Sequence, residues 1–342
     1  MADVLKGSSQ INCDAVEWAP TVSAGGKRLL AVATYEWAGV RTEPRHGHVK
    51  LIGVRGADGS EPLGMQQVSQ IDTRGVLDIK WQGRMLADAN SDGSVGLHVL
   101  DEDETACATV ARVRGVEEEE EHTIALSLDW DSHKDGRLAV SLSTGKLAVM
   151  HAAEAGLTRE RTFDAHDLYG QVIEVWITAF DRYAPEVLYS GADDTFFKAW
   201  DLRTDCARPT LVNKSHGMGV CSIQSNPHRE FELATGSYDE SFRLFDTRNL
   251  RKPLLEYPLG GGVWRIKWNP ARESRVLIAT MRAGIQVLDL SPDAQAPVYH
   301  YHGHDPELSY GVDWAPGPDQ SLVGTCSFTH EDSYHVWRVP QQ

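Results

Sequence analysis

The chain has 342 residues, of which 41% are hydrophobic and 24% charged, an ordinary balance for a folded protein with a large core. A formal net charge of −16 argues against nucleic acid as a partner, because phosphate binding needs a basic surface. No stretch approaches the roughly 20 apolar residues of a membrane span, and the five cysteines are scattered, so we expect a soluble, cytoplasmic protein with reduced thiols and no membrane contact.

A short unit recurs seven times along the chain. It is a strand-like run of alternating apolar residues that usually ends in an aromatic residue, at positions 18, 81, 130, 180, 225, 268 and 314. After a first interval of 63 residues, the units follow one another at 43 to 50 residues, near the ~40–45-residue period of WD-repeat blades. The long first interval places an insertion in the first blade, around residues 35 to 48.

Each unit is followed by a second pattern, a strand of small residues, a turn and a strand that ends in a bulky residue. Its clearest copies span Tyr189–Asp201 and Ala234–Asp246. Short alternating strands joined by Gly, Asp and Asn turns exclude a helical repeat. The sequence therefore predicts an all-β fold in which residues 1–342 form one domain, a seven-bladed WD-repeat β-propeller.

The loops before the blades carry histidines that have an architectural interpretation. In WD-repeat blades a loop histidine bonds a hydroxyl and a turn aspartate, and a tryptophan N–H supports the hydroxyl. Blade four has all four members, and we expect them to form a buried network. They are His166, Ser190, Asp194 and Trp200.

Blade five keeps only part of this set. His216 is followed by Thr235 and Asp239, but Phe245 stands where the donor tryptophan would be. This leaves His216 open between architecture and acid–base chemistry. His304 repeats the loop position before blade seven, and we expect an architectural role for it.

One position of each unit is expected to face an end of the central channel. Three of the seven residues there are large aromatics, and Glu174 lies two residues before the first of them. One interpretation is packing between blades. The other is an aromatic, acidic cup that holds a quaternary ammonium by cation–π contact. The seven residues are Asp14, Leu77, Leu126, Trp176, Cys221, Trp264 and Tyr310.

Three well-known catalytic or phosphate-binding motifs are absent from the sequence. The chain has no HExxH metal motif, no GxSxG nucleophile elbow and no glycine-rich phosphate loop. We therefore predict no metal site and no cofactor, and any active site has to be assembled across blades. The acidic run Glu117–Glu121 is interpreted as a solvated loop.

Several runs extend beyond the WD-repeat pattern and resemble the diphthine methyl ester hydrolase family. They cover residues 165 to 337 densely, whereas the first 160 residues match only as propeller blades. The runs that carry the resemblance are Glu174–Phe180, Tyr189–Asp194, His216–Arg229, Leu233–Asp239, Gly261–Trp268, Tyr310–Trp314 and Cys326–Phe328.

The resemblance implies hydrolysis of the methyl ester of methylated diphthine on translation elongation factor 2, which frees the carboxylate for later amidation to diphthamide. The implied substrate carries a trimethylammonium beside the ester, a group that the aromatic cup is suited to hold. Elongation factor 2 is then the partner, and we expect the protein to be a monomer. The competing hypothesis is a non-catalytic adaptor that presents a protein-binding face.

Ester hydrolysis needs an activated nucleophile and donors for the oxyanion. We predict a water activated by His216, with Glu174 orienting it or holding the ammonium and with Arg265 or nearby backbone amides stabilising the oxyanion. A Cys221 thiolate is an alternative nucleophile, although Cys221 as a small buried hydrophobe is another interpretation. The predicted substrate-binding residues are Trp176, Trp264, Tyr310, Cys221 and Asp14.

Overall fold

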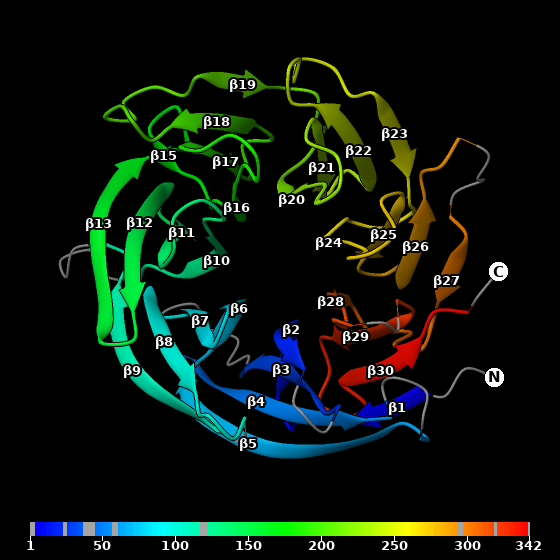
Figure 1. Cartoon of the computed structure of the whole chain (residues 1–342). Coiled ribbons are helices and arrows are strands. Elements are labelled where there is room, and N and C mark those ends of the chain that lie inside the picture. Colours follow the sequence, from blue (N-terminus) through cyan, green and yellow to red (C-terminus); the bar gives the residue numbers. More distant parts are fainter. Residues whose placement is uncertain are drawn as a thin grey trace.

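The computed structural model describes residues 4–22, 26–36, 45–56, 61–104, 106–116, 122–292, 297–317 and 320–340. These residues form β-strands and no helix, and they therefore include no helix that could cross a membrane. Seven four-stranded antiparallel sheets are arranged radially around a central axis (Figure 1). The predicted all-β, seven-bladed WD-repeat propeller is confirmed.

Six blades are each built from four strands that follow one another in the chain. Blade one consists of β2 (Asn12–Val22), β3 (Arg28–Tyr35), β4 (His46–Arg55) and β5 (Gly64–Arg74), and blade two of β6 (Val76–Gln82), β7 (Met85–Asn90), β8 (Ser94–Leu100) and β9 (Cys107–Arg114). Blade three consists of β10 (Ala125–Trp130), β11 (Arg137–Leu142), β12 (Lys146–Ala153) and β13 (Gly156–Asp164), and blade four of β16 (Ile177–Phe180), β17 (Val187–Gly191), β18 (Phe197–Asp201) and β19 (Leu211–Asn213). Blade five consists of β20 (Val220–Ser225), β21 (Glu232–Ser237), β22 (Ser241–Asp246) and β23 (Leu255–Pro258), and blade six of β24 (Arg265–Trp268), β25 (Arg275–Ala279), β26 (Ile285–Asp289) and β27 (Tyr299–Tyr301).

The last blade joins the two ends of the chain. Its inner strands are β28 (Ser309–Trp314), β29 (Leu322–Ser327) and β30 (Tyr334–Arg338), and its outer strand is β1 (Val4–Gly7). β1 pairs antiparallel with β30, with Val4 opposite Trp337. The first and the last strand of the chain therefore lie side by side at one side of the ring (Figure 1). Pairing the first strand with the last blade closes the ring.

The extra length of the first blade lies partly in its strands. β2 to β5 have 8 to 11 residues, whereas β16 to β19 of blade four have three to five. Around the predicted insertion, β3 ends at Tyr35 and β4 begins at His46. Residues 37–44 between them lie outside the described residues, as does the acidic run at 117–121.

Buried side chains fill the spaces between the blades. Every residue of β3, β11 and β29 is buried, because a middle strand has a neighbouring blade on each face. The described residues form seven apolar clusters, one at each interface between neighbouring blades. The recurring aromatic of the repeat lies in these interfaces. The indole of Trp130 donates to the carbonyl of Lys80 at 2.9 Å, and that of Trp314 to Lys267 at 3.0 Å.

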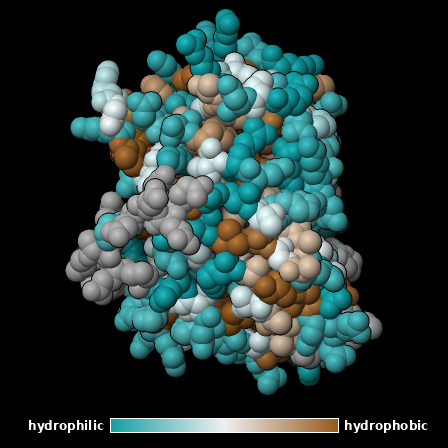
Figure 2. Space-filling model, turned by 90° about the vertical axis from the view of Figure 1, so that its left-hand side faces the viewer, coloured by the Kyte–Doolittle hydropathy of each residue, from teal (hydrophilic) through white to brown (hydrophobic). Residues whose placement is uncertain are grey.

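One hairpin stands outside the blades. β14 (Asp167–Leu168) and β15 (Gln171–Val172) pair between blades three and four, and Tyr169 at their turn is 97% exposed. The side of the molecule that carries β9 and β13 is mostly hydrophilic, with apolar residues in smaller groups (Figure 2).

Candidate functional site

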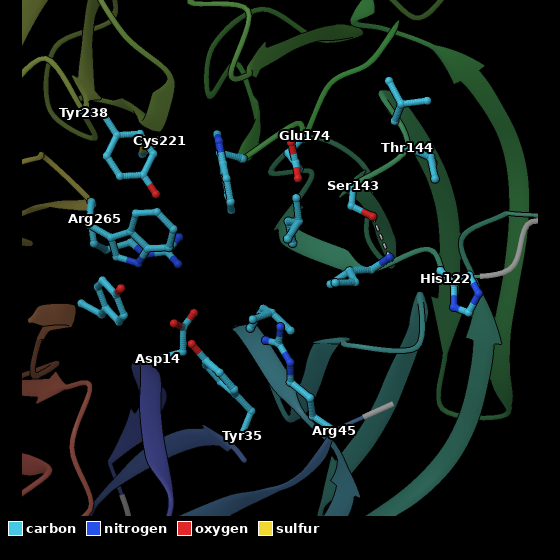
Figure 3. Close-up of a pocket in the computed structure, with 17 residues that line it drawn as sticks. Asp14, Tyr35, Arg45, His122, Ser143, Thr144, Glu174, Cys221, Tyr238 and Arg265 are labelled. Carbon is cyan, nitrogen blue, oxygen red and sulfur yellow. Dashed lines mark hydrogen bonds between the residues drawn. The ribbon is translucent and has the colours of Figure 1, made fainter. Parts of the chain in front are cut away.

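A cavity of about 490 Å³ lies at one end of the central channel. Every blade contributes to its lining, because the inner strands of the blades begin here. The cavity is large enough for a small-molecule or side-chain ligand, since ligand pockets are typically ~300–1,000 Å³. The residues at the predicted rim position, Asp14, Leu77, Leu126, Trp176, Cys221, Trp264 and Tyr310, all line it. Polar and aromatic neighbours are Tyr35, Arg45, His122, Glu174, Tyr238 and Arg265 (Figure 3).

A repeated β-bulge explains why these positions face the cavity. The pairing of the first two strands skips a residue between Cys13 and Ala15, and the skipped residue is Asp14. A bulged residue leaves the ladder, so its side chain is directed differently from those of its neighbours. Leu77, Leu126, Cys221 and Tyr310 occupy the equivalent shifts of their blades. In blades four and six the rim residue directly precedes β16 or β24.

Four aromatic rings form one wall of the cavity. Trp264 lies at its centre, with ring centroids 5.8 Å from Trp176, 5.9 Å from Tyr238 and 5.1 Å from Tyr310. The indole N–H of Trp176 donates to Asp193 at 2.8 Å, which fixes that ring. Such a wall offers aromatic faces to a cationic ligand.

Sequence reasoning missed Tyr238, although two glycines point to it. A Cβ at Gly219 would come within 3.2 Å of the Tyr238 ring, and one at Gly262 within 3.4 Å. Both glycines lie two residues before a rim position. Their lack of a side chain leaves room for the fourth ring, and this is the signal that could have found it.

A polar, charged region adjoins the aromatic wall, because Asp14 interacts with Tyr238 and Tyr310, and it is called here the charged end of the cavity. The buried Arg265 guanidinium bridges both oxygens of Asp78, at 3.2 and 3.4 Å. Asp14 is also buried, and burial raises the pKa of its carboxyl to about 7, with Arg265 opposing the rise. The Arg45 guanidinium lies 5.1 Å from the centre of the Tyr35 ring. Two arginines and a buried carboxyl therefore meet at this end.

Ion pairs continue from Asp78 along the channel. Lys80 contacts Asp78 at 2.8 Å and Glu17 at 3.8 Å. Lys267 contacts Glu17 at 2.5 Å and Asp313 at 3.4 Å. These residues come from inner strands of different blades, so the network holds the charged end of the cavity in place.

No family model matches the chain. A chain in a crystal structure of a mitotic checkpoint complex has a TM-score of 0.72 at 16% identity, covers 99% of this chain, is itself 91% covered, and shows the fold alone. Human diphthine methyltransferase is 35% identical, and the match covers 90% of this chain and 73% of the human protein. The chain belongs to the diphthine methyltransferase family.

Further members of the family support the same assignment. The mouse diphthine methyltransferase is also 35% identical, over 90% of this chain and 68% of its own length. The Schizosaccharomyces pombe protein of that name is 31% identical, over 88% of both chains. Coverage of this extent includes blades from the first half of the chain, where the sequence alone indicated only the blade pattern.

The hydrogen-bond network predicted for blade four is present in the structure. The two ring nitrogens of His166 bond Asp194 and Ser190, each at 2.8 Å, and the Trp200 indole donates to Ser190 at 2.8 Å. His166 is buried, and burial lowers its pKa. The architectural role expected for this histidine is confirmed.

His216 has the same kind of placement as His166. Its Nε2 bonds the Thr235 hydroxyl at 2.9 Å, as His304 bonds Thr325 at 2.9 Å. Burial lowers the pKa of His216 to about 4, and Arg243 adds to the effect. His216 is not among the residues that line the cavity. The structure therefore does not bring the predicted base to the predicted substrate-binding residues, because its ring points into the blade.

The remaining predicted residues do line the cavity. The Cys221 thiol is buried and donates to the carbonyl of Gly219 at 3.5 Å, and burial raises its pKa well above the usual value. These features favour a neutral thiol over a thiolate nucleophile. Glu174 lies in the wall beside Trp176, and its carbonyl accepts the amide of Asp193 at 3.1 Å. Arg265 lies at the charged end.

Proposed function

We propose that this chain acts in diphthamide biosynthesis by hydrolysing the methyl ester of methylated diphthine on translation elongation factor 2. The observation that carries the proposal is one cavity that combines the aromatic wall with the charged end, where Arg265 lies. The name of the curated relatives, diphthine methyltransferase, supports the same substrate class.

The aromatic wall suits the trimethylammonium of this substrate. A quaternary ammonium cannot donate hydrogen bonds, so the faces of Trp176, Tyr238 and Trp264 are its best partners. Glu174 beside Trp176 adds a negative charge on the same side. With the ammonium held there, the ester group lies toward Arg45 and Arg265.

The charged end suits the chemistry of the ester. When water adds to the carbonyl carbon, negative charge develops on the carbonyl oxygen, and positioned cations lower the energy of that state. Arg265 is held in place by Asp78, so little reorganisation is needed as the charge develops. After methanol leaves, the same arginines face the product carboxylate.

The test is incubation of the purified chain with elongation factor 2 that carries methylated diphthine. Hydrolysis releases methanol and leaves the free acid, which mass spectrometry of the modified peptide detects. Elongation factor 2 that already carries the free acid serves as the control. Stable binding without methanol release would identify an adaptor. In a parallel incubation of the free-acid factor with a methyl donor such as S-adenosylmethionine, gain of a methyl group by the factor would identify transfer in the direction that the relatives' name states. Either result contradicts hydrolysis.

A further inference from the structure

Asp14 is placed at the enclosed, charged end of the cavity by the bulge in β2. The residue is only 3% exposed, yet it lines the cavity. Its carboxylate points to the same region as the Tyr35 hydroxyl and the Arg45 guanidinium (Figure 3). Bulges often re-aim a side chain beside an active site, and here the re-aimed group is a carboxyl.

Opposing effects act on the Asp14 carboxyl. Burial and the neighbouring Asp78 favour the neutral carboxyl, whereas Arg265 and Arg45 favour the ionised one. Burial has the largest effect and raises the pKa of Asp14 to about 7. A carboxyl that titrates near neutral pH can both accept a proton and return it within one catalytic cycle.

The three other acid–base candidates named from the sequence are less well placed for the ester. The Cys221 thiol donates to a backbone carbonyl, and His216 bonds Thr235 outside the lining. Glu174 belongs to the wall beside Trp176, where the proposed function puts the ammonium. Asp14 lies instead with Arg45 and Arg265, where the ester carbonyl is expected.

We propose that Asp14 is the general base of the ester hydrolysis, an inference that rests on the proposed function. The Asp14 carboxylate takes a proton from a water molecule as the water oxygen bonds to the ester carbonyl carbon. The resulting oxyanion faces Arg45 and Arg265. The intermediate then breaks its bond to the methoxy oxygen, and Asp14 returns the proton to that oxygen. The Asp14 carboxylate is thereby restored, the carboxylic acid product loses its proton to solvent beside Arg45 and Arg265, and methanol and the carboxylate leave.

The first arm of the test compares Asp14→Asn with Asp129→Asn. Asp129 is a matched control, because burial also raises its pKa to about 7, but it accepts the Phe180 amide at 2.8 Å and is not among the cavity-lining residues. We expect Asp14→Asn to slow single-turnover methanol release at least ~100-fold, with binding of the modified factor retained, because general base catalysis contributes about 10²–10⁴ in rate. Asp129→Asn should keep the wild-type rate.

The second arm measures the pH dependence of kcat/KM in the wild-type protein. A base must be ionised, so the rate should rise with pH through an ionisation near 7 and then level off. This ionisation should be absent from the residual activity of Asp14→Asn. The titratable and charged groups that face Asp14 are Tyr35, Arg45, Asp78, Tyr238, Arg265, Tyr310 and the Cys13 and Cys326 thiols.

The outcomes separate the two proposals. A wild-type protein that releases no methanol overturns the proposed function and the role of Asp14 with it. A folded Asp14→Asn variant that hydrolyses within about threefold of wild type overturns the role of Asp14 alone. If Asp14→Asn does not fold, the pH dependence of kcat/KM in the wild-type protein decides whether Asp14 is the base. A rise near pH 7 supports the assignment, and a flat profile overturns it.

Discussion

At the scale of single residues, Trp264 is the centre of the aromatic wall and contacts three other rings. We expect Trp264→Ala to raise KM for the modified elongation factor about 5- to 30-fold, because a desolvated cation–π contact contributes on the order of 1–2 kcal/mol. The thermal midpoint should change less. Both steady-state kinetics and thermal unfolding are needed to check this.

Trp264→Phe is the matched variant, because it keeps an aromatic face. It should recover most of the lost affinity. If the midpoint of Trp264→Ala collapses while the folded fraction hydrolyses with an unchanged KM, the ring serves packing between blades and the ammonium site lies elsewhere.

The two loop histidines should respond differently to substitution. His166→Ala removes one member of a buried four-residue network and leaves Asp194 and Ser190 without their bonds to it, so we expect a loss of about 2–3 kcal/mol in the free energy of unfolding. His216→Ala removes only the bond to Thr235, since its Nδ1 has no partner among the described residues. A smaller loss is expected, measured by denaturant unfolding.

The activity of the His216→Ala variant tests the hypothesis drawn from the sequence. If His216 activates water, hydrolysis by the folded variant falls at least ~100-fold. The position of the ring outside the cavity lining favours a rate close to wild type instead. Cys221→Ser, measured alongside, should also keep its activity, because the buried thiol is neutral.

At the scale of elements, β1 is the strand that closes the ring. Its two faces differ, because Leu5 packs against the cluster between blades seven and one, whereas Val4 is 37% exposed. We expect Leu5→Asp to lower the free energy of unfolding by about 1–3 kcal/mol and Val4→Asp by less than about 0.5 kcal/mol. Chemical unfolding of both variants gives the comparison. Equal effects would show that the packing of Leu5 does not contribute to the stability of the closed ring.

At the scale of the whole molecule, the inner strands bring a set of carboxyls into the central channel. Burial raises the pKa of Asp14 and Asp129 to about 7 and that of Asp313 to about 6. Each therefore binds a proton more tightly in the folded than in the unfolded chain. Their contribution to stability is largest below pH 4 and falls as pH rises from about 4 to 7.

Asp129→Asn tests the contribution of one of these carboxyls to stability. Asparagine does not ionise, and its oxygen can still accept the hydrogen bond from the Phe180 amide. The gain in thermal midpoint of this variant over wild type should be larger at pH 8 than at pH 5. The reverse order would show that the carboxyl is stabilised as an anion in the folded protein. Comparison of variant and wild type at each pH cancels the effect of the buried histidines, whose lowered pKa values act in the opposite direction.

Local sequence patterns are enough to predict the number of blades and, in each blade, the residue position that faces the cavity. Both follow from local patterning, because apolar alternation and turn residues report which face of a strand is buried, and repetition multiplies the signal. The same patterns also identified three of the four rings of the wall and the His166 network. Each of these depends on contacts within one blade or on a position common to all blades.

The contacts between residues of different blades could not be predicted in this way, because they depend on how the blades pack. Tyr35, Arg45 and Tyr238 enter the cavity from turns and strand ends whose direction no periodic pattern encodes. His216 and Cys221 are five residues apart, yet a bulge directs Cys221 to the cavity while the His216 ring turns into the blade. Ring closure by β1 and the pairing of Arg265 with Asp78, 187 residues away, likewise depend on chain packing rather than on local sequence.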